Sequence, residues 1–148
     1  ALPTGSVRLH GNELLTLPGA GETKAADGTR IIDREWVRIN LGRVHAKVEY
    51  LKLMNWEIAW SVQHAPAKFD ASACKVYGTE LATEAYRLLM EVLGPIAQLR
   101  QGSPGAAVRG RIERLHRSSL ILTFGGGTNE VQRDIIAMTA LRQPPAPR

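Results

Sequence analysis

The stretch 33–62, DREWVRINLGRVHAKVEYLKLMNWEIAWSV, decides the fold of this chain. Its apolar residues recur alternately four and three positions apart, and this spacing places them in one stripe along an α-helix. The stripe consists of Val37, Leu41, Val44, Val48, Leu51, Ile58 and Val62. Asp33 stands where an N-cap is expected, and the polar Asn55 within the stripe can fix the register against a neighbouring helix. So long and regular a stripe predicts a helical bundle or a coiled coil.

Three more helices are expected along the chain. The segment 69–93 repeats the same spacing, and its small residues Gly78 and Ala85 permit close approach of a neighbouring helix. A third helix is expected over 108–123, and a fourth follows a glycine turn, with apolar residues from 131 to 141. No stretch alternates cleanly enough for a β-sheet. The pattern predicts an all-α protein, an up-and-down four-helix bundle.

The chain divides into an arm, a bundle and a tail. Residues 1–32 are rich in glycine and proline and carry only short apolar pieces, which predicts an irregular arm or linker. The helical bundle is expected over 33–142, and prolines make 143–148 a tail. A chain of 148 residues with 44% hydrophobic residues suits one domain with a substantial core. Three tryptophans beside the long stripe predict packing or an interface: Trp36, Trp56 and Trp60.

Composition narrows the class of protein. The net charge is +5, and the basic excess gathers between Arg100 and Arg117, which leaves open a basic helical adaptor or a nucleic-acid-binding bundle. No zinc-finger spacing or aromatic RNA-binding signature supports that alternative. The lone Cys74 excludes an intramolecular disulfide and suits a reducing compartment. No apolar run approaches the roughly 18 residues of a membrane span, and no residues have metal-ligand spacing, so we expect a cytoplasmic protein without a metal.

The segment 124–133, FGGGTNEVQR, is the candidate binding site. Gly125, Gly126 and Gly127 can adopt positive φ and bring backbone N–H groups close to a ligand. Thr128 can cap a helix whose first N–H groups and dipole attract an anion. These features predict phosphate binding. An ordinary glycine-rich connection between helices is the alternative that the residues alone leave open.

Three motifs together resemble one family. Lys47-Val-Glu49 lies in the first helix, Glu113-Arg-x-x-Arg117 lies in the third, and Gly127-Thr-Asn-Glu-Val-Gln-Arg133 opens the last. Their order and spacing resemble the C-terminal helical domain of flavin-dependent acyl-CoA dehydrogenases over about residues 33–140. The resemblance implies a subunit whose N-terminal helical domain and middle β domain precede this bundle. It also implies a homo- or hetero-oligomer, a dimer of dimers held through the bundle.

The resemblance further implies a cofactor and a reaction of lipid metabolism. Such enzymes bind FAD and introduce an α,β double bond into an acyl-CoA thioester: a carboxylate removes the α-proton, and the β-hydrogen leaves as hydride to the flavin. Carried over, Gly127, Thr128 and Glu130 approach the flavin diphosphate. Glu91 and Gly94 stand where the family's Gln-x-x-Gly-Gly element reaches the adenine end of a neighbouring subunit's flavin.

Three positions depart from the family pattern. Gly126 occupies the place of the catalytic glutamate of the commonest branch, so no catalytic residue is assigned in this chain; some branches carry their base on the helix before the long one. The segment Lys24-Ala-Ala-Asp-Gly28 replaces Arg-x-x-Phe-Gly and lacks both the guanidinium and the aromatic ring. Of the Gln-x-x-Gly-Gly element only Gly94 is kept, with Glu91 in place of the glutamine.

Two interpretations within the family remain open. In one, the chain is part of a working dehydrogenase whose base lies outside it. In the other, it belongs to the non-catalytic subunit of an α2β2 acyl-CoA dehydrogenase, like the paired subunits that handle steroid side chains in actinobacteria. The sequence leaves the type of acyl chain open, and a chain that only oligomerises is a third alternative.

Overall fold

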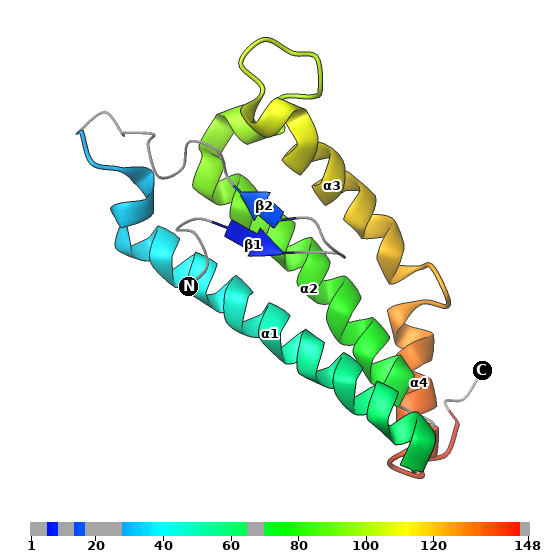
Figure 1. The fold of residues 1–148 in the computed structure, drawn as a ribbon. Helices are drawn as coiled ribbons and strands as arrows, with labels where there is room; N and C mark the ends of the chain where they lie inside the picture. Colours follow the sequence, from blue (N-terminus) through cyan, green and yellow to red (C-terminus); the bar gives the residue numbers. More distant parts are fainter. Residues whose placement is uncertain (1–5, 9–13, 17–27, 65–69, 146–148) are drawn as a thin grey trace.

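The computed structural model describes residues 6–8, 14–16, 28–64 and 70–145. Within these ranges the α-helices are α1 (Glu35–His64), α2 (Asp70–Leu93), α3 (Arg111–Ser119) and α4 (Asn129–Thr139) (Figure 1). Short 3-10 helices adjoin them: η1 (Ile31–Asp33), η2 (Gly94–Gln98), η3 (Ala107–Gly110) and η4 (Leu120–Thr123). The predicted all-α class is confirmed, with its helices in the expected order.

A short hairpin lies in the region expected to be an irregular arm. Strands β1 (Ser6–Arg8) and β2 (Leu14–Thr16) pair antiparallel, with Val7 opposite Leu15. β1 lies beside α1. The expectation of a fully irregular arm without a sheet therefore does not describe these residues. Strands of three residues are too short for the alternating pattern that would reveal them in a sequence.

The first helix begins later than its predicted cap. Asp33 lies in η1, where its carboxylate accepts hydrogen bonds from Nε (2.6 Å) and Nη2 (2.8 Å) of Arg30. The carbonyl of Arg34 instead accepts the backbone N–H of Arg38 at 3.1 Å. The expectation that Asp33 caps the helix is therefore wrong, because its carboxylate is held by a neighbouring guanidinium.

The core forms where α1 meets α2 and α3. The buried side chains of its centre are Val37, Val44 and Val48 of α1, Leu81, Ala85, Leu89 and Val92 of α2, and Ile112 of α3. A β-carbon added at Gly78 would lie 3.4 Å from Cδ1 of Leu51, which confirms that this small residue permits close approach of α1. Lys47 and Glu84 form an ion pair that joins the same two helices.

The second helix is the centre of the molecule, because it contacts each of the other three (Figure 1). α4 lies against its N-terminal half, where Lys75 and Glu80 contact residues of α4. α3 lies further along α2, with Ser119 Oγ 3.4 Å from Thr83 Oγ1. The two short helices thus cover successive parts of one long helix. None of the described helices combines the length and apolar character that crossing a lipid bilayer requires.

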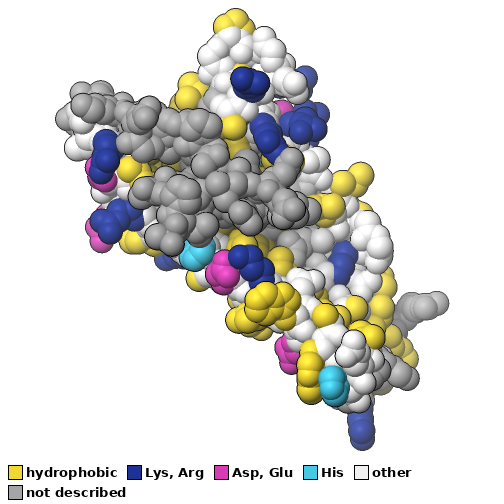
Figure 2. Space-filling model, viewed as in Figure 1, with side chains coloured by type: hydrophobic (Ala, Val, Ile, Leu, Met, Phe, Trp, Pro, Cys, Tyr) yellow, Lys and Arg dark blue, Asp and Glu magenta, His cyan; other side chains and the backbone are white. Residues whose placement is uncertain are grey.

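Among the described residues, the α1 stripe is buried most completely in its first half. Val37 and Val44 are almost fully buried, whereas Val62 is 66% exposed. The exposed fractions of Trp56 and Trp60 are 71% and 62%. Figure 2 shows hydrophobic side chains at the surface over this part of the molecule. Asn55 is also exposed; its amide donates to the carbonyl of Leu51 at 2.7 Å, and its side chain hydrogen-bonds the thiol of Cys74 on α2.

Candidate functional site

The turn between η4 and α4 has the open backbone that the glycines predict. Gly126 and Gly127 have φ of 69° and 91° and are exposed, which confirms positive φ at these two positions. A β-carbon added at Gly126 would meet nothing within 4 Å, whereas one at Gly127 would lie 2.9 Å from Nε2 of Gln132. That amide donates to the carbonyl of Gly126 at 3.0 Å. The turn is therefore shaped by α4 and open on its outer side.

Thr128 caps α4 as predicted. Its hydroxyl oxygen accepts the backbone N–H of Val131 at 3.3 Å, and its carbonyl accepts the N–H of Gln132 at 3.0 Å. Among the described residues, the N–H groups of Gly126 and Gly127 donate to no backbone carbonyl. Backbone donors just before a helix start, together with the helix dipole, form a favourable environment for an anion.

Glu130 lies in the first turn of α4 and is exposed. Its pKa is lowered, first because its own backbone N–H donates to the carboxylate and second because of a hydrogen bond with the side chain of Thr128. Arg133 and Lys75 lower the pKa further, by charge. An easily ionised carboxylate is a weak proton acceptor at neutral pH. Glu130 is therefore poorly suited to act as the base in place of the catalytic glutamate, whose position is occupied here by Gly126. Its oxygens are suited to accept hydrogen bonds from hydroxyl groups.

Lys75 of α2 lies directly behind the turn, and no motif in the sequence indicates a role for it. Its ammonium donates to Oδ1 of Asn129 at 2.6 Å, to the carbonyl of Gly127 at 2.8 Å and to the carbonyl of Thr123 at 3.3 Å. The three acceptors come from the start of α4, the glycine turn and the last residue of η4. One side chain of α2 thus joins three consecutive pieces of the site.

Asn129 continues this polar contact between α2 and α4. Only 4% of it is exposed, and its Oδ1 also accepts from Oγ1 of Thr79 at 3.2 Å. Its Nδ2 donates to Oε1 of Glu80 at 3.4 Å, and the same oxygen pairs with Arg133. The polar residues at i, i+4 and i+5 of α2 share one face of that helix, as do those at i and i+4 of α4, but no signal in the sequence pairs the two sets.

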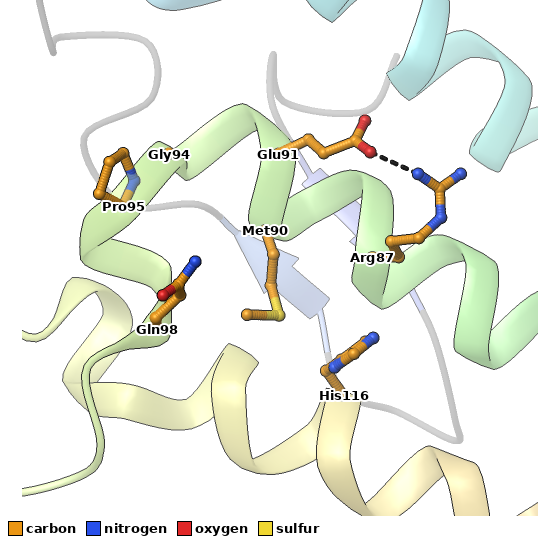
Figure 3. A pocket seen from close by; sticks show the side chains of 7 residues that line it. All are labelled: Arg87, Met90, Glu91, Gly94, Pro95, Gln98 and His116. Atoms are coloured by element: carbon orange, nitrogen blue, oxygen red, sulfur yellow. Dashed lines mark hydrogen bonds and ion pairs between the residues drawn. The ribbon is translucent and has the colours of Figure 1, made fainter.

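The second predicted segment lies at the C-terminal end of α2. Gly94 has φ of 69°, and Glu91 forms an ion pair with Arg87 one turn earlier. The segment borders a pocket of about 390 Å³ between the end of α2, η2 and α3 (Figure 3). In Figure 3 the side chains of Met90 and His116 lie on one side of α2, whereas Glu91 points to the other side, toward Arg87.

The two groups of predicted site residues do not come together in this chain. Lys75, which binds the turn at Gly127, is 19 positions before Gly94 along α2. At 1.5 Å per residue the two ends are separated by about 28 Å. The candidate residues therefore form two separate groups, called candidate half-sites below: the α4 mouth, formed by Gly126, Gly127, Thr128 and Glu130, and the α2 end, formed by Glu91 and Gly94.

Other candidate groups are structural. Burial raises the pKa of the Cys74 thiol, with a hydrogen bond from Asn55 partly opposing it, so this cysteine is a poor nucleophile. Arg117 pairs with Glu113 through Nε and Oε1 at 2.9 Å, as the i,i+4 spacing predicts. Among the described residues, no group of three or more His, Cys, Asp and Glu side chains is placed to hold a metal ion.

Comparison with known proteins places this chain in a family. Residues 17–141 match the family described as acyl-CoA dehydrogenase, C-terminal domain. Acyl-CoA dehydrogenase FadE26 of Mycobacterium tuberculosis is 68% identical over 133 residues, which are 87% of this chain and 33% of that protein. Acyl-CoA dehydrogenase FadE29 of the same organism is 34% identical over 122 residues, which are 82% of this chain and 31% of that protein.

Solved structures agree with this assignment. The ChsE4-ChsE5 complex from Mycobacterium tuberculosis contains a chain that is 68% identical, with a TM-score of 0.81 over 88% of this chain and 33% of that one. A structure described as the Tcur3481-Tcur3483 steroid ACAD is 39% identical, with a TM-score of 0.74 over 82% of this chain and 32% of that one. The chain thus spans about a third of the length of these relatives. It belongs to the acyl-CoA dehydrogenase family and corresponds to that family's C-terminal domain.

Proposed function

We propose that this chain is the C-terminal part of one subunit of a heteromeric, FAD-dependent acyl-CoA dehydrogenase. The enzyme introduces an α,β double bond into an acyl-CoA thioester, and the acyl group is a steroid side chain. Two of the similar solved structures are described as the ChsE4-ChsE5 complex and the Tcur3481-Tcur3483 steroid ACAD, and both names pair two different proteins. This chain contributes flavin-phosphate binding and subunit assembly.

The α4 mouth is the observation that carries the flavin proposal. The exposed, open backbone at Gly126, the positive φ of Gly127 and the capped start of α4 at Thr128 suit a diphosphate, because phosphate oxygens accept hydrogen bonds from backbone N–H groups. Glu130 suits the hydroxyl groups of the same cofactor. FAD, when bound, accepts the hydride that leaves the β-carbon of the substrate.

The α-proton is removed by a residue outside this chain. Gly126 has no side chain, and Glu130 has a lowered pKa. Lowering the pKa of a base reduces the driving force for proton transfer, so the mouth is suited to holding the cofactor and not to proton abstraction. The base belongs either to another part of the same subunit or to its partner.

The uncovered half of α1 serves assembly. Trp56 and Trp60 stand one turn apart on the same face of α1 and are both exposed, and exposed aromatic side chains grouped in this way usually mark protein–protein contacts. The ring of Trp60 is already ordered by stacking on His64, with ring centroids 4.3 Å apart. We assign this surface to the contact with a neighbouring subunit.

The test is to purify the full-length protein alone and together with the product of the neighbouring gene. We expect a yellow, FAD-containing complex only after co-expression, and bleaching of its visible absorption when a steroid side-chain acyl-CoA is added anaerobically. Bleaching by a straight-chain acyl-CoA but not by the steroid side-chain acyl-CoA would contradict the substrate assignment. A yellow and active protein obtained without the partner would contradict the proposal that the enzyme is heteromeric.

A further inference from the structure

Lys75 supports the glycine turn from behind, a role that none of the predicted site residues has. A lysine ammonium carries three N–H donors, and here each has its own acceptor: the carbonyls of Thr123 and Gly127 and the side-chain oxygen of Asn129. Because the donors are fully used, Lys75 has none left for a ligand. Its effect on a ligand therefore passes through the turn.

The turn needs such support, because its own sequence does not fix its shape. Three consecutive glycines allow a wide range of backbone conformations, and ordering them costs more entropy than ordering other residues. Along the turn, Gly125 donates to the carbonyl of Ile121 at 3.1 Å, whereas the carbonyl of Gly127 is bound by Lys75. Binding the carbonyl of Gly127 also orients the N–H of Thr128, because the C=O and N–H of this one planar peptide point in opposite directions.

We propose that Lys75 is a positioning residue for the flavin diphosphate. Lys75 holds the turn 125–128 in a conformation that presents backbone N–H groups to the ligand. Its buried partner Asn129 fixes the position of α4 along α2. This inference rests on the proposed function, since it assumes that the α4 mouth receives FAD. Lys75 itself does not touch the cofactor.

The experiment measures flavin affinity in the co-expressed complex after its FAD has been removed. Lys75→Met keeps the length of the side chain without its donors, and Lys75→Arg keeps the charge but replaces three convergent donors on one atom with a planar fork. The control is Lys52→Met, which removes an exposed lysine whose partner is Glu49 on the same helix. Each protein is titrated with FAD and with riboflavin, which has no phosphate.

We expect Lys75→Met to weaken FAD binding by about tenfold, the order of magnitude lost when a residue that supports a binding group without touching the ligand is removed, and to leave riboflavin binding unchanged. Lys75→Arg should behave like Lys75→Met, and Lys52→Met like the wild type. Equal loss of both flavins would show a merely structural role, and full affinity in Lys75→Arg would show that charge alone matters. Either result overturns the assignment, as does wild-type FAD affinity in Lys75→Met.

A second variant covers the case in which Lys75→Met does not assemble. Asn129→Ala removes one of the three acceptors and keeps Lys75, so we expect a smaller loss of FAD affinity in the same direction. Unchanged FAD affinity in Asn129→Ala would then overturn the inference. If the wild-type complex itself binds no FAD, the proposed function fails, and that result is distinct from a failure confined to the Lys75 variants.

Discussion

The hydroxyl of Thr128 accepts the backbone N–H of Val131, and this single bond closes the first turn of α4 next to the glycine turn. The N–H groups of Gly126 and Gly127, which precede the helix, donate to no carbonyl of the described backbone. The same residue therefore has two roles that can be separated by mutation: it stabilises α4, and it shapes the mouth that is proposed to bind the flavin diphosphate.

Replacing Thr128 with alanine should lower the free energy of unfolding by about 1 kcal/mol, the usual value of a lost N-cap. It should also weaken flavin retention in the assembled protein. Thr128→Ser keeps the hydroxyl and serves as the control. Thermal unfolding and the ratio of flavin to protein absorbance measure the two effects. Unchanged flavin occupancy in Thr128→Ala would remove this residue from the site.

The stability conferred by Glu130 should depend on pH. Its pKa in the folded protein lies below the ordinary value of 4.5, so the ionised carboxylate stabilises the fold above that pH, and the contribution is lost as the pH falls through the lowered pKa. Glu130→Gln should therefore be less stable than the wild type at pH 7, with the difference vanishing in acid. Denaturant unfolding at several pH values measures it, with the exposed Glu57→Gln as control. A difference that does not shrink as the pH falls below 4.5 would contradict the mechanism.

Gly110 should tolerate no side chain. It has φ of 71°, and a β-carbon there would lie 2.3 Å from the backbone nitrogen of Gln101. Gly102 has φ of 90° with nothing within 4 Å, so it isolates the cost of the backbone conformation. We expect Gly102→Ala to cost about 1–2 kcal/mol. Gly110→Ala should cost about 1–3 kcal/mol more through overpacking. Equal melting temperatures of the two variants would show that the loop relaxes freely.

Trp56→Glu should prevent assembly without unfolding the chain. Trp56 is 71% exposed, so the substitution removes little packing within the subunit but places a charge on the surface assigned to the neighbouring subunit. Size-exclusion chromatography with light scattering should show a smaller species with a normal circular dichroism spectrum. A control at the polar surface of the same helix is Arg43→Glu. An intact complex containing Trp56→Glu would place the interface elsewhere.

The helices could be predicted from the sequence because their apolar spacing is regular. The stripe from Val37 to Leu51 and the small residue Gly78 gave the pairing of α1 with α2, and Thr128 gave the start of α4. The helix ends were harder to predict. Asp33 is of a residue type that often caps helices, but its carboxylate is bound by Arg30. Such competition between neighbouring side chains is not visible in the spacing of apolar residues.

The glycine turn and helix cap of the candidate site could be predicted from the sequence, but the residues that support them could not. Glycines and a capping threonine are local signals, so the α4 mouth could be recognised within ten residues of sequence. Lys75 and Asn129 are 54 positions apart, and no local pattern relates them. Their contact follows from the way α4 packs on α2, and only the folded chain brings them together.

The separation of the two half-sites along α2 has an evolutionary consequence. Substitutions at one end of the helix leave the backbone of the other end intact, so two duplicated genes can each lose a different half and still complete one cofactor site between their products. Selection would then act on the pair and no longer on either gene alone. In the proposed heteromer, this chain would be the copy that keeps the glycine-threonine motif, with Gly94 retained at the far end.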